Sequence, residues 1–406
     1  MGLDERSWET IASDSVLLKA VGNWRENSEK WLEYSIERLN ETVRVNPLRE
    51  DIVWVENWLE EIGGTKIEWF TGVGSAWNLP FPRGKAEGDV KIILSALHET
   101  GRLTRQEAVS MIPAIVLDAK PGELVLDMCA SPGSKTTQIA EHLEGSGIVM
   151  ANEIASSRIN TLVANVKRHG SITPIITHHD GRFIPKVPET GFDKILVDAP
   201  CTGSATTRKN PEVWKKWLPS GGKSLHKLQL ELLLKAINLT KPGGKIVYST
   251  CSLDPVENEA VISEVLRLSK EISLVPMSEK LVDLPGRCGM TDWPQLDDSG
   301  NIIESSKIVK SMLPPTDIDI KEELKKCLRI WNDDVKAGGF FVAVLKKEEE
   351  YVEKIVDFDK IIEPEKVKPD EINFPQPISS KIEDMILDTL GWDEKNLWIR
   401  GKSILW

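Results

Sequence analysis

The sequence lacks the features that mark secreted, membrane and zinc-binding proteins. It has only five cysteines in 406 residues, an odd and widely spaced set that does not indicate a disulfide framework: Cys129, Cys201, Cys251, Cys288 and Cys327. No Cys-x-x-Cys pair or His/Cys cluster predicts a metal site. No apolar run approaches the roughly 18 residues of a membrane span, and residues 1–9 are too polar for a secretory signal. These absences favour a reduced, cytoplasmic protein with no metal and no membrane partner.

Basic residues are too few to make the chain cationic. The 51 Lys and Arg residues face 63 Asp and Glu residues, so the formal net charge is −12. Hydrophobic residues make up 40% of the chain and charged residues 28%, which is ordinary for a globular protein and excludes a wholly disordered one. An acidic chain of this kind can bind nucleic acid only through a local basic face.

Tryptophan is abundant near the N-terminus, where seven of the 14 lie before residue 78. These tryptophans follow apolar helical faces, so core packing is favoured over base stacking. The patterns in this part predict a small α/β domain, with helices over 31–39, 52–62 and 89–117, strands over 43–45 and 66–69, and a loop over 78–88.

From Gly122 onward the pattern changes to alternating strands and helices. Such alternation predicts an α/β fold with a parallel, doubly wound sheet, in which ligands bind beyond the carboxyl ends of the strands. The predicted strands cover 123–127, 147–151, 172–176, 192–197, 245–249 and 340–345, and the helices 134–143, 155–168, 224–239 and 257–268.

A loop of small residues, 127–137, follows the first of these strands and opens a helix. It is not a Walker A loop, because Ser134 separates Gly133 from Lys135, and it has only one glycine of the dinucleotide-binding pattern. Its backbone N–H groups can still approach a ligand, and the helix N-terminus favours a carboxylate there. The alternative is an ordinary strand–helix turn.

Acidic residues end four consecutive parallel strands: Asp127, Glu153, Asp180 and Asp198. For each of these residues taken alone, the alternative interpretation is an ordinary acidic residue at the surface. An acid at the end of the second strand is placed to bond ribose hydroxyls, as Glu153 would. So many carboxylates do not suit a phosphate-rich cofactor, whereas they do suit a cationic nucleoside.

Two cysteines follow strand ends, Cys201 in DAPCTGS and Cys251 in STCSLDPVENE. A single cysteine there would be interpreted as inert packing, but two beside tight turns at one sheet edge predict a shared reactive cleft. No Cys–His–Asn pattern accompanies them, which argues against a hydrolase.

The chain resembles the Sun/Nop family of RNA cytosine-5 methyltransferases, most closely the tRNA-type branch of eukaryotes and archaea. The resemblance covers residues 44–347 and rests on RQEAVSMIP, DMCASPGSKTTQ, DAPCTGS, YSTCSLDPVENEAVI and GGFFVAVLKK, in that order. It implies a Rossmann-like S-adenosylmethionine-dependent core and a small N-terminal domain of RNA-recognition type. The expected organisation is a helical segment (1–40), an RNA-binding domain (41–118), a catalytic domain (119–347), and a linker and C-terminal segment of unknown role (348–406).

The resemblance also implies a role for each matching residue. Glu153 matches the ribose-binding acid, Asp180 the residue beside the adenine amine, and Arg158 a position near the cofactor. The S-adenosylmethionine amino-acid pocket would consist of Cys129, Ala130, Ser131, Pro132, Gly133, Ser134 and Lys135. Asp198 would lie near both the methyl donor and the target base.

The implied chemistry needs two thiols. Cytosine carbon 5 is a poor nucleophile until a thiolate, from Cys251, adds to carbon 6. Asp198 is the candidate for a hydrogen bond at ring nitrogen 3, and Lys135 or a helix N-terminus for the positive field. Cys201 would accept the carbon-5 proton so that the product can leave.

A basic segment follows Cys201 and predicts an RNA-tracking surface, with Trp214 and Trp217 interleaved: Arg208, Lys209, Lys215, Lys216, Lys223 and Lys227. A solvated helix is the alternative. Transfer RNA is the expected partner, and ribosomal RNA with the same chemistry stays open. So do a DNA methyltransferase, which would use Cys201 as nucleophile, and a non-catalytic RNA-binding scaffold.

Overall fold

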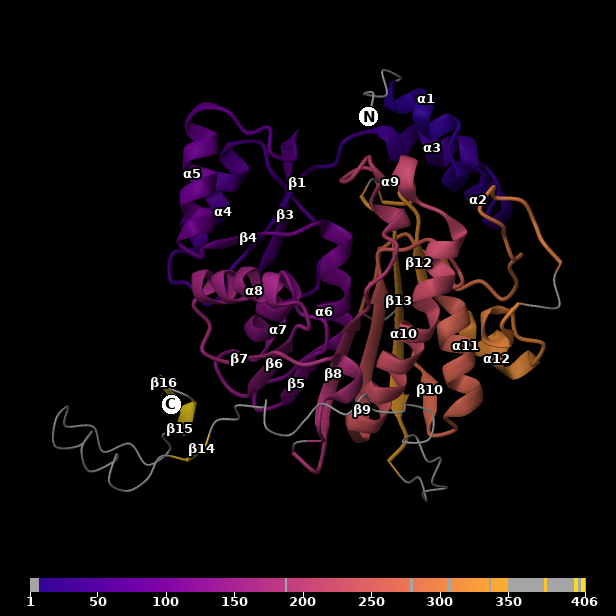
Figure 1. Ribbon diagram of the computed structural model, residues 1–406. Coiled ribbons are helices and arrows are strands. Elements are labelled where there is room, and N and C mark those ends of the chain that lie inside the picture. The colour runs from indigo at the N-terminus through magenta and orange to yellow at the C-terminus, as the bar shows by residue number, and fades with distance from the viewer. Residues whose placement is uncertain are drawn as a thin grey trace. The chain divides into compact units, whose positions relative to one another are not determined.

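The computed structural model describes residues 7–349, apart from 187, 278–279, 305–307 and 336, together with three short strands nearer the C-terminus (Figure 1). By contacts the chain divides into two units, Met1–Glu353 and Lys354–Trp406. In the second, β14 (Gln376–Pro377), β15 (Trp398–Arg400) and β16 (Ser403–Leu405) form an antiparallel sheet in that order. Most of the predicted C-terminal segment, 348–406, lies outside the described residues.

Three short helices open the first unit: α1 (Trp8–Ser13), α2 (Val16–Trp24) and α3 (Ser28–Ile36). The hydroxyls of Ser7 and Ser15 cap α1 and α2 by accepting hydrogen bonds from backbone N–H groups. Trp24 and Trp31 are buried, as core packing predicts, whereas Trp8 and Trp54 are 39% and 54% exposed.

A β-α-β-β-α-β domain follows the helices: β1 (Asn40–Val45), α4 (Ile52–Glu61), β2 (Thr65–Lys66), β3 (Ser75–Pro82), α5 (Gly88–Glu99) and β4 (Leu103–Arg105). Its antiparallel sheet has the order β2-β3-β1-β4. The loop predicted over 78–88 is wrong for residues 78–82, which belong to β3. The helix predicted over 89–117 is interrupted by β4. Pro80 and Pro82 weaken the local strand signal of β3, and pairing with β1 provides what the local sequence does not.

The two faces of this small sheet are both covered. Helices α4 and α5 bury one face, around Val43, Trp58 and Trp77. On the other face, Arg44 lies opposite Ala76 in the pairing of β1 with β3, and both are buried. RNA-recognition domains stack bases on such a face, but here Arg44 bonds Glu141 and Thr137 of the following domain instead. The central part of this sheet is therefore an internal interface.

The large sheet confirms the predicted Rossmann-like architecture. Its strand order is β11-β12-β13-β9-β8-β5-β6-β7, and β10 pairs with β13. The strands β5 to β9 run parallel, and β10 to β13 complete the sheet by antiparallel pairing. Their bounds are β5 (Leu124–Asp127), β6 (Ile148–Asn152), β7 (Pro174–Thr177), β8 (Phe192–Asp198), β9 (Thr240–Thr250), β10 (Ile272–Leu274), β11 (Arg287–Cys288), β12 (Leu328–Ile330) and β13 (Phe340–Lys347).

Helices cover this sheet from two sides (Figure 1). On one side lie α6 (Ile112–Leu117), α7 (Ser134–His142) and α8 (Ser156–His169), and on the other α10 (Pro219–Leu239), α11 (Glu259–Leu268) and α12 (Ile318–Leu324). The short α9 (Val213–Lys216) and the 3-10 turns η1 (Ala108–Met111), η2 (Gly181–Phe183), η3 (Ser204–Thr206) and η4 (Lys310–Met312) lie in the connections. Among the described residues, no helix is both long and apolar enough to cross a bilayer.

Candidate active site

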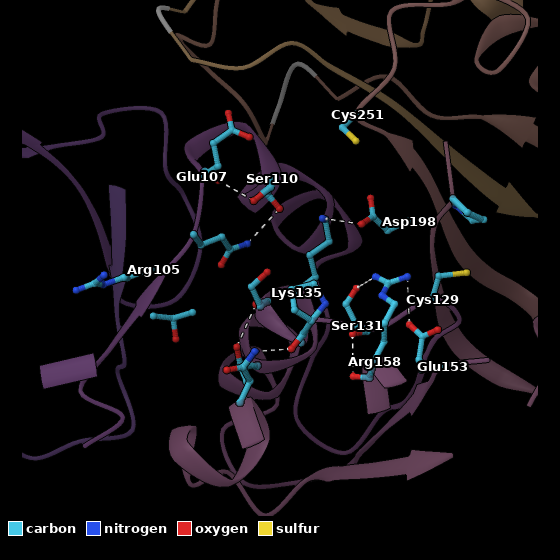
Figure 2. A pocket seen from close by; sticks show the side chains of 18 of the residues that line it. Arg105, Glu107, Ser110, Cys129, Ser131, Lys135, Glu153, Arg158, Asp198 and Cys251 are labelled. Atoms are coloured by element: carbon cyan, nitrogen blue, oxygen red, sulfur yellow. Dashed lines mark hydrogen bonds and ion pairs between the residues drawn. The ribbon is translucent and has the colours of Figure 1, made fainter. Parts of the chain in front are cut away.

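A cavity of about 820 Å³ opens at the carboxyl ends of the parallel strands. It brings together almost every residue for which a cofactor or catalytic role is predicted (Figure 2). Ala130 does not line it, because its side chain packs with Leu162 and Val166 while its N–H donates to the Asn152 carbonyl. The lining residues among the predicted set are Cys129, Ser131, Pro132, Gly133, Ser134, Lys135, Glu153, Arg158, Asp180, Asp198, Cys201, Lys209 and Cys251.

The loop between β5 and α7 is held in place by side chains of α8. Arg158 donates to the Ser131 carbonyl at 2.5 Å, and Asn165 donates to the Pro132 carbonyl at 2.6 Å. Gly133 has a φ of +108°, and a Cβ there would lie 2.9 Å from a Leu162 methyl, so both space and conformation require glycine. The predicted cofactor residue Arg158 thus shapes the loop that lines the cavity.

The acids at the strand ends have different surroundings. Glu153 is 3% exposed, accepts the Ala155 N–H at 2.8 Å and lies 3.5 Å from Arg158. Burial opposes the ionisation of Asp180, but hydrogen bonds from Arg182 hold its pKa below the ordinary value. Asp180 therefore presents to the cavity an ionised carboxylate that also accepts hydrogen bonds from Arg182.

Asp127 departs from the expected pattern, because it does not line the cavity. It is buried and accepts a hydrogen bond from the Thr136 hydroxyl at 2.7 Å. Burial raises the pKa of Asp127 to about 7. It supports the start of α7, so three of the four strand-end acids face the cavity.

Lys135 and Asp198 form an ion pair inside the cavity, with 2.7 Å between Nζ and Oδ2 (Figure 2). The second oxygen of Asp198 accepts the Ser249 hydroxyl at 2.8 Å. Burial disfavours the charge on Lys135, but Asp198 outweighs it and raises the pKa of the ammonium above the ordinary value. Lys135 also interacts electrostatically with Cys251, which gives the positive group predicted near that thiol.

The two predicted thiols lie side by side. Cys201 follows β8 and Cys251 follows β9, and their sulfur atoms are 3.3 Å apart. The hydrogen bond to Cys251, together with burial, raises the pKa of Cys201 well above its ordinary value. The two thiols can therefore share a hydrogen bond in which either sulfur atom is the donor.

The basic segment is only partly the surface that its composition predicts. Trp214 and Trp217 are buried against the N-terminal helices, with edge-to-face contacts to Trp31 and Trp24, so they are not available for base stacking. Arg208 is also buried and donates to the carbonyls of Glu37 and Ala337, so it is structural. The predicted base stacking by Trp214 and Trp217 and the predicted RNA contact of Arg208 are therefore wrong, because long-range packing covers these three side chains.

The remaining basic residues differ in position. Lys209 is exposed and lines the cavity, whereas Lys223 donates to the Leu296 carbonyl at 2.6 Å. Lys215 lies over the Trp8 ring, and Lys216 and Lys227 are exposed beside Glu212 and Glu231. Lys209 is thus the member of the segment that shares the cavity with the two thiols.

The sequence did not predict that the N-terminal domain also lines the cavity, through Thr42, Arg83, Arg105 and Glu107 among others. Glu107 accepts the Gly338 N–H at 2.8 Å, and burial raises its pKa. Two of these residues belong to RQEAVSMIP, so the motif carried a signal to which no role was assigned. No group of three or more metal-ligating side chains occurs in the described part of the chain.

Known proteins resemble this chain over most of its length. The family model described as 16S rRNA methyltransferase RsmB/F matches residues 114–346. The multisite-specific tRNA:(cytosine-C(5))-methyltransferase of Saccharomyces cerevisiae is 40% identical over 68% of this chain, which spans only 44% of the yeast protein. The tRNA (cytosine(49)-C(5))-methyltransferase of Pyrococcus abyssi is 37% identical, with 79% of this chain and 93% of the relative covered.

A solved structure agrees with the sequence comparisons. The methyltransferase homolog protein from Pyrococcus horikoshii aligns with a TM-score of 0.61 and 30% identity, covering 81% of this chain and 93% of its own. The motifs, the strand order and these relatives point the same way. The chain belongs to the RsmB/F, or Sun/Nop, family of RNA methyltransferases.

Proposed function

We propose that this chain methylates carbon 5 of cytosine in tRNA, with S-adenosylmethionine as methyl donor and a covalent cysteine adduct as intermediate. The observation that carries the proposal is the pair of thiols 3.3 Å apart, in the same cavity as the Lys135–Asp198 ion pair. Its five cysteines are all free thiols, which fits a reducing cytoplasmic location.

The cavity fits the proposed cofactor. The loop ends at the N-terminus of α7, which has no side-chain cap, so backbone N–H groups there can bond the carboxylate of a ligand. Glu153 and Asp180 would accept hydrogen bonds from ribose hydroxyls and from the adenine amine. S-adenosylmethionine, when bound, supplies the methyl group and a positive charge, which suits a cavity lined by three strand-end acids.

The thiols would then have separate tasks. Cys251 Sγ adds to carbon 6, which makes carbon 5 electron-rich enough to take the methyl group. Asp198 and Lys135 would bond the polar edge of the cytosine ring and favour this addition. Cys201 would accept the proton from carbon 5, after which the bond between carbon 6 and Cys251 Sγ breaks.

The hydrogen bond between the thiols supports this division of labour. While both sulfur atoms are free, burial and the contact with Cys251 raise the pKa of Cys201, which favours its neutral form. Once Cys251 is bonded to carbon 6, the largest cause of the raised pKa of Cys201 is removed. Cys201 would then lose its proton to solvent more readily and become able to accept the one on carbon 5.

Transfer RNA is the proposed substrate because the archaeal relative, covered almost completely, is named for tRNA. The family description names 16S rRNA, so ribosomal RNA is the alternative. Bisulfite sequencing of tRNA and rRNA after incubation with protein and S-adenosylmethionine separates the two. Protected cytosines in rRNA and none in tRNA would contradict the proposed substrate.

Cofactor affinity should depend on the strand-end acids. Asp180→Ala and Glu153→Ala each remove a buried or half-buried acceptor, so each should weaken S-adenosylmethionine binding by about 1–3 kcal/mol. Isothermal titration calorimetry measures the change. Asp292→Ala, which removes an exposed acid that does not line the cavity, is the matched control. Affinities equal to the control in both variants would refute the assignment.

RNA affinity should depend on Lys209 more than on net charge. Lys209→Ala should weaken tRNA binding and reduce the slope of log affinity against log salt by about one, because one phosphate contact is lost. Lys325→Ala removes an exposed lysine that does not line the cavity and should leave the slope unchanged. An unchanged slope in Lys209→Ala would mean that Lys209 is only solvated. The double variant Lys215→Glu with Lys216→Glu tests whether the rest of the basic segment also contributes to tRNA affinity.

A further inference from the structure

A fully buried carboxylate, Glu257, bonds both of the loops that carry the thiols. Its Oε1 accepts the Thr202 N–H at 2.9 Å, and its Oε2 accepts the Thr202 hydroxyl at 2.5 Å. The same Oε2 accepts the Ser252 hydroxyl at 2.5 Å. Thr202 and Ser252 each directly follow one of the cysteines, so one side chain connects the residues next to both sulfur atoms.

The two loops depend on Glu257 to different degrees. The Cys251 loop has a second support in Asn258, which accepts the Thr250 hydroxyl at 2.6 Å and donates to the Ser252 carbonyl at 2.9 Å. In the Cys201 loop, the backbone N–H of Thr202 has Glu257 as its partner. Gln229 also bonds the Pro200 carbonyl, and Trp217 donates to the Thr202 hydroxyl. Further along, the loop meets the Cys251 loop directly, since the Ala205 N–H donates to the Cys251 carbonyl at 3.0 Å and the Leu253 N–H donates to the Ser204 hydroxyl at 2.7 Å. Glu257 is thus the side chain that bonds the residue next to Cys201 to the Cys251 loop.

A carboxylate suits this position because each group that is hydrogen-bonded to its oxygens is a donor. Gln229 gives Glu257 a fourth hydrogen bond, at 3.0 Å, so the two oxygens accept four in all. Burial, with a contribution from Glu257, raises the pKa of the adjacent Asp254 to about 8, so Asp254 is largely neutral near pH 7. Burial also raises the pKa of Glu257, and its four hydrogen-bond donors oppose that shift, so the donors favour placing the negative charge of the two acids on Glu257.

We infer that Glu257 is a positioning residue that holds the Cys201 thiol against Cys251, and that it thereby sets the rate of product release. The thiol geometry is independent of any substrate. The link to release rests on the proposed function, in which Cys201 accepts the carbon-5 proton. Glu257 does not line the cavity and acts through Thr202 and Ser252, the residues that follow the two cysteines.

The thiol geometry can be measured without RNA or cofactor. Diamide takes two electrons and two protons from a pair of nearby thiols and leaves a disulfide, so its rate with Cys201 and Cys251 reports their alignment. Glu257→Ala should slow this rate by about tenfold to a hundredfold, since alignment is lost. Glu257→Gln should lie between wild type and alanine, because the amide keeps one acceptor oxygen. Cys288→Ser removes the exposed cysteine from all samples, and peptide mass spectrometry identifies the disulfide.

Asp254→Asn is the matched control, because it alters a carboxyl in the same buried cluster whose hydrogen bond stays within its own loop. Its oxidation rate should equal that of wild type. If Glu257→Ala does not fold, Thr202→Val keeps the shape of the residue. It removes the hydroxyl's bonds to Glu257 and from Trp217 but keeps the backbone bond to Glu257, so it should give a smaller slowing. Oxidation of Glu257→Ala or Thr202→Val at the wild-type rate would overturn the inference.

The effect on release is measured with RNA and S-adenosylmethionine. Attack by Cys251 should persist in Glu257→Ala, while a denaturation-resistant protein–RNA complex accumulates as in Cys201→Ala. If Cys201→Ala accumulates the covalent complex with RNA and Glu257→Ala does not, Glu257 does not control product release. If no variant retains RNA, including Cys201→Ala, the proposed adduct mechanism fails, and the order of oxidation rates still tests the position of Cys201.

Discussion

Replacing Cys251 with alanine should abolish methylation and prevent any covalent complex with RNA, since it removes the proposed nucleophile that adds to carbon 6. Replacing Cys201 should have a different effect. Attack and methyl transfer would proceed, but the carbon-5 proton would remain, so the protein would stay bonded to RNA. Activity should fall by about 10²–10⁴, the usual contribution of a general base. A slow band on a denaturing gel measures the complex.

The same two variants separate the alternatives that the sequence leaves open. A mechanism of the DNA type would reverse the phenotypes, with adduct in Cys251→Ala and none in Cys201→Ala. A non-catalytic scaffold would give no adduct and no methylation in any form, wild type included. Cys288→Ser is the control, because Cys288 is exposed and does not line the cavity. Trapping in Cys251→Ala alone would overturn the assignment of the nucleophile.

Replacing Arg44 with methionine should lower the free energy of unfolding by about 3–5 kcal/mol, because it leaves a buried carboxylate without its cation. Arg44 is fully buried and lies 3.0 Å from Glu141, whose other oxygen bonds His169. The same guanidinium donates to the Thr137 hydroxyl in the first turn of α7, directly after the cofactor loop. We therefore expect weaker S-adenosylmethionine binding as well as lower stability.

Urea titration measures the loss, and Arg267→Met is its matched control. Arg267 forms an exposed Arg–Glu pair with Glu264, and such a pair contributes less than about 1 kcal/mol. The double variant Arg44→Met with Glu141→Leu should recover much of the stability, because an apolar pair can replace a buried ion pair. If Arg44→Met were no less stable than Arg267→Met, the buried pair would not hold the N-terminal sheet to the core.

The sequence by itself determined the parts of this protein that short-range patterns encode. Strand–helix alternation predicted the parallel sheet, and strand polarity then required Glu153, Asp180 and Asp198 to meet at one edge. The same polarity brought Cys201 and Cys251 together, although they are 50 residues apart. These inferences need only the direction of each strand, which local apolar periodicity reveals.

Tertiary structure alone decided which surfaces are covered and which side chains support the thiols. The burial of Arg208, Trp214 and Trp217 depends on the N-terminal helices, which lie far away in the chain. The four bonds of Glu257 join three separate segments, and β3 becomes a strand only when β1 pairs with it. The physical reason is common to all three. Periodicity reports that a face is apolar or that a carboxyl is present, whereas its partner is chosen by long-range contacts that form when the whole chain folds.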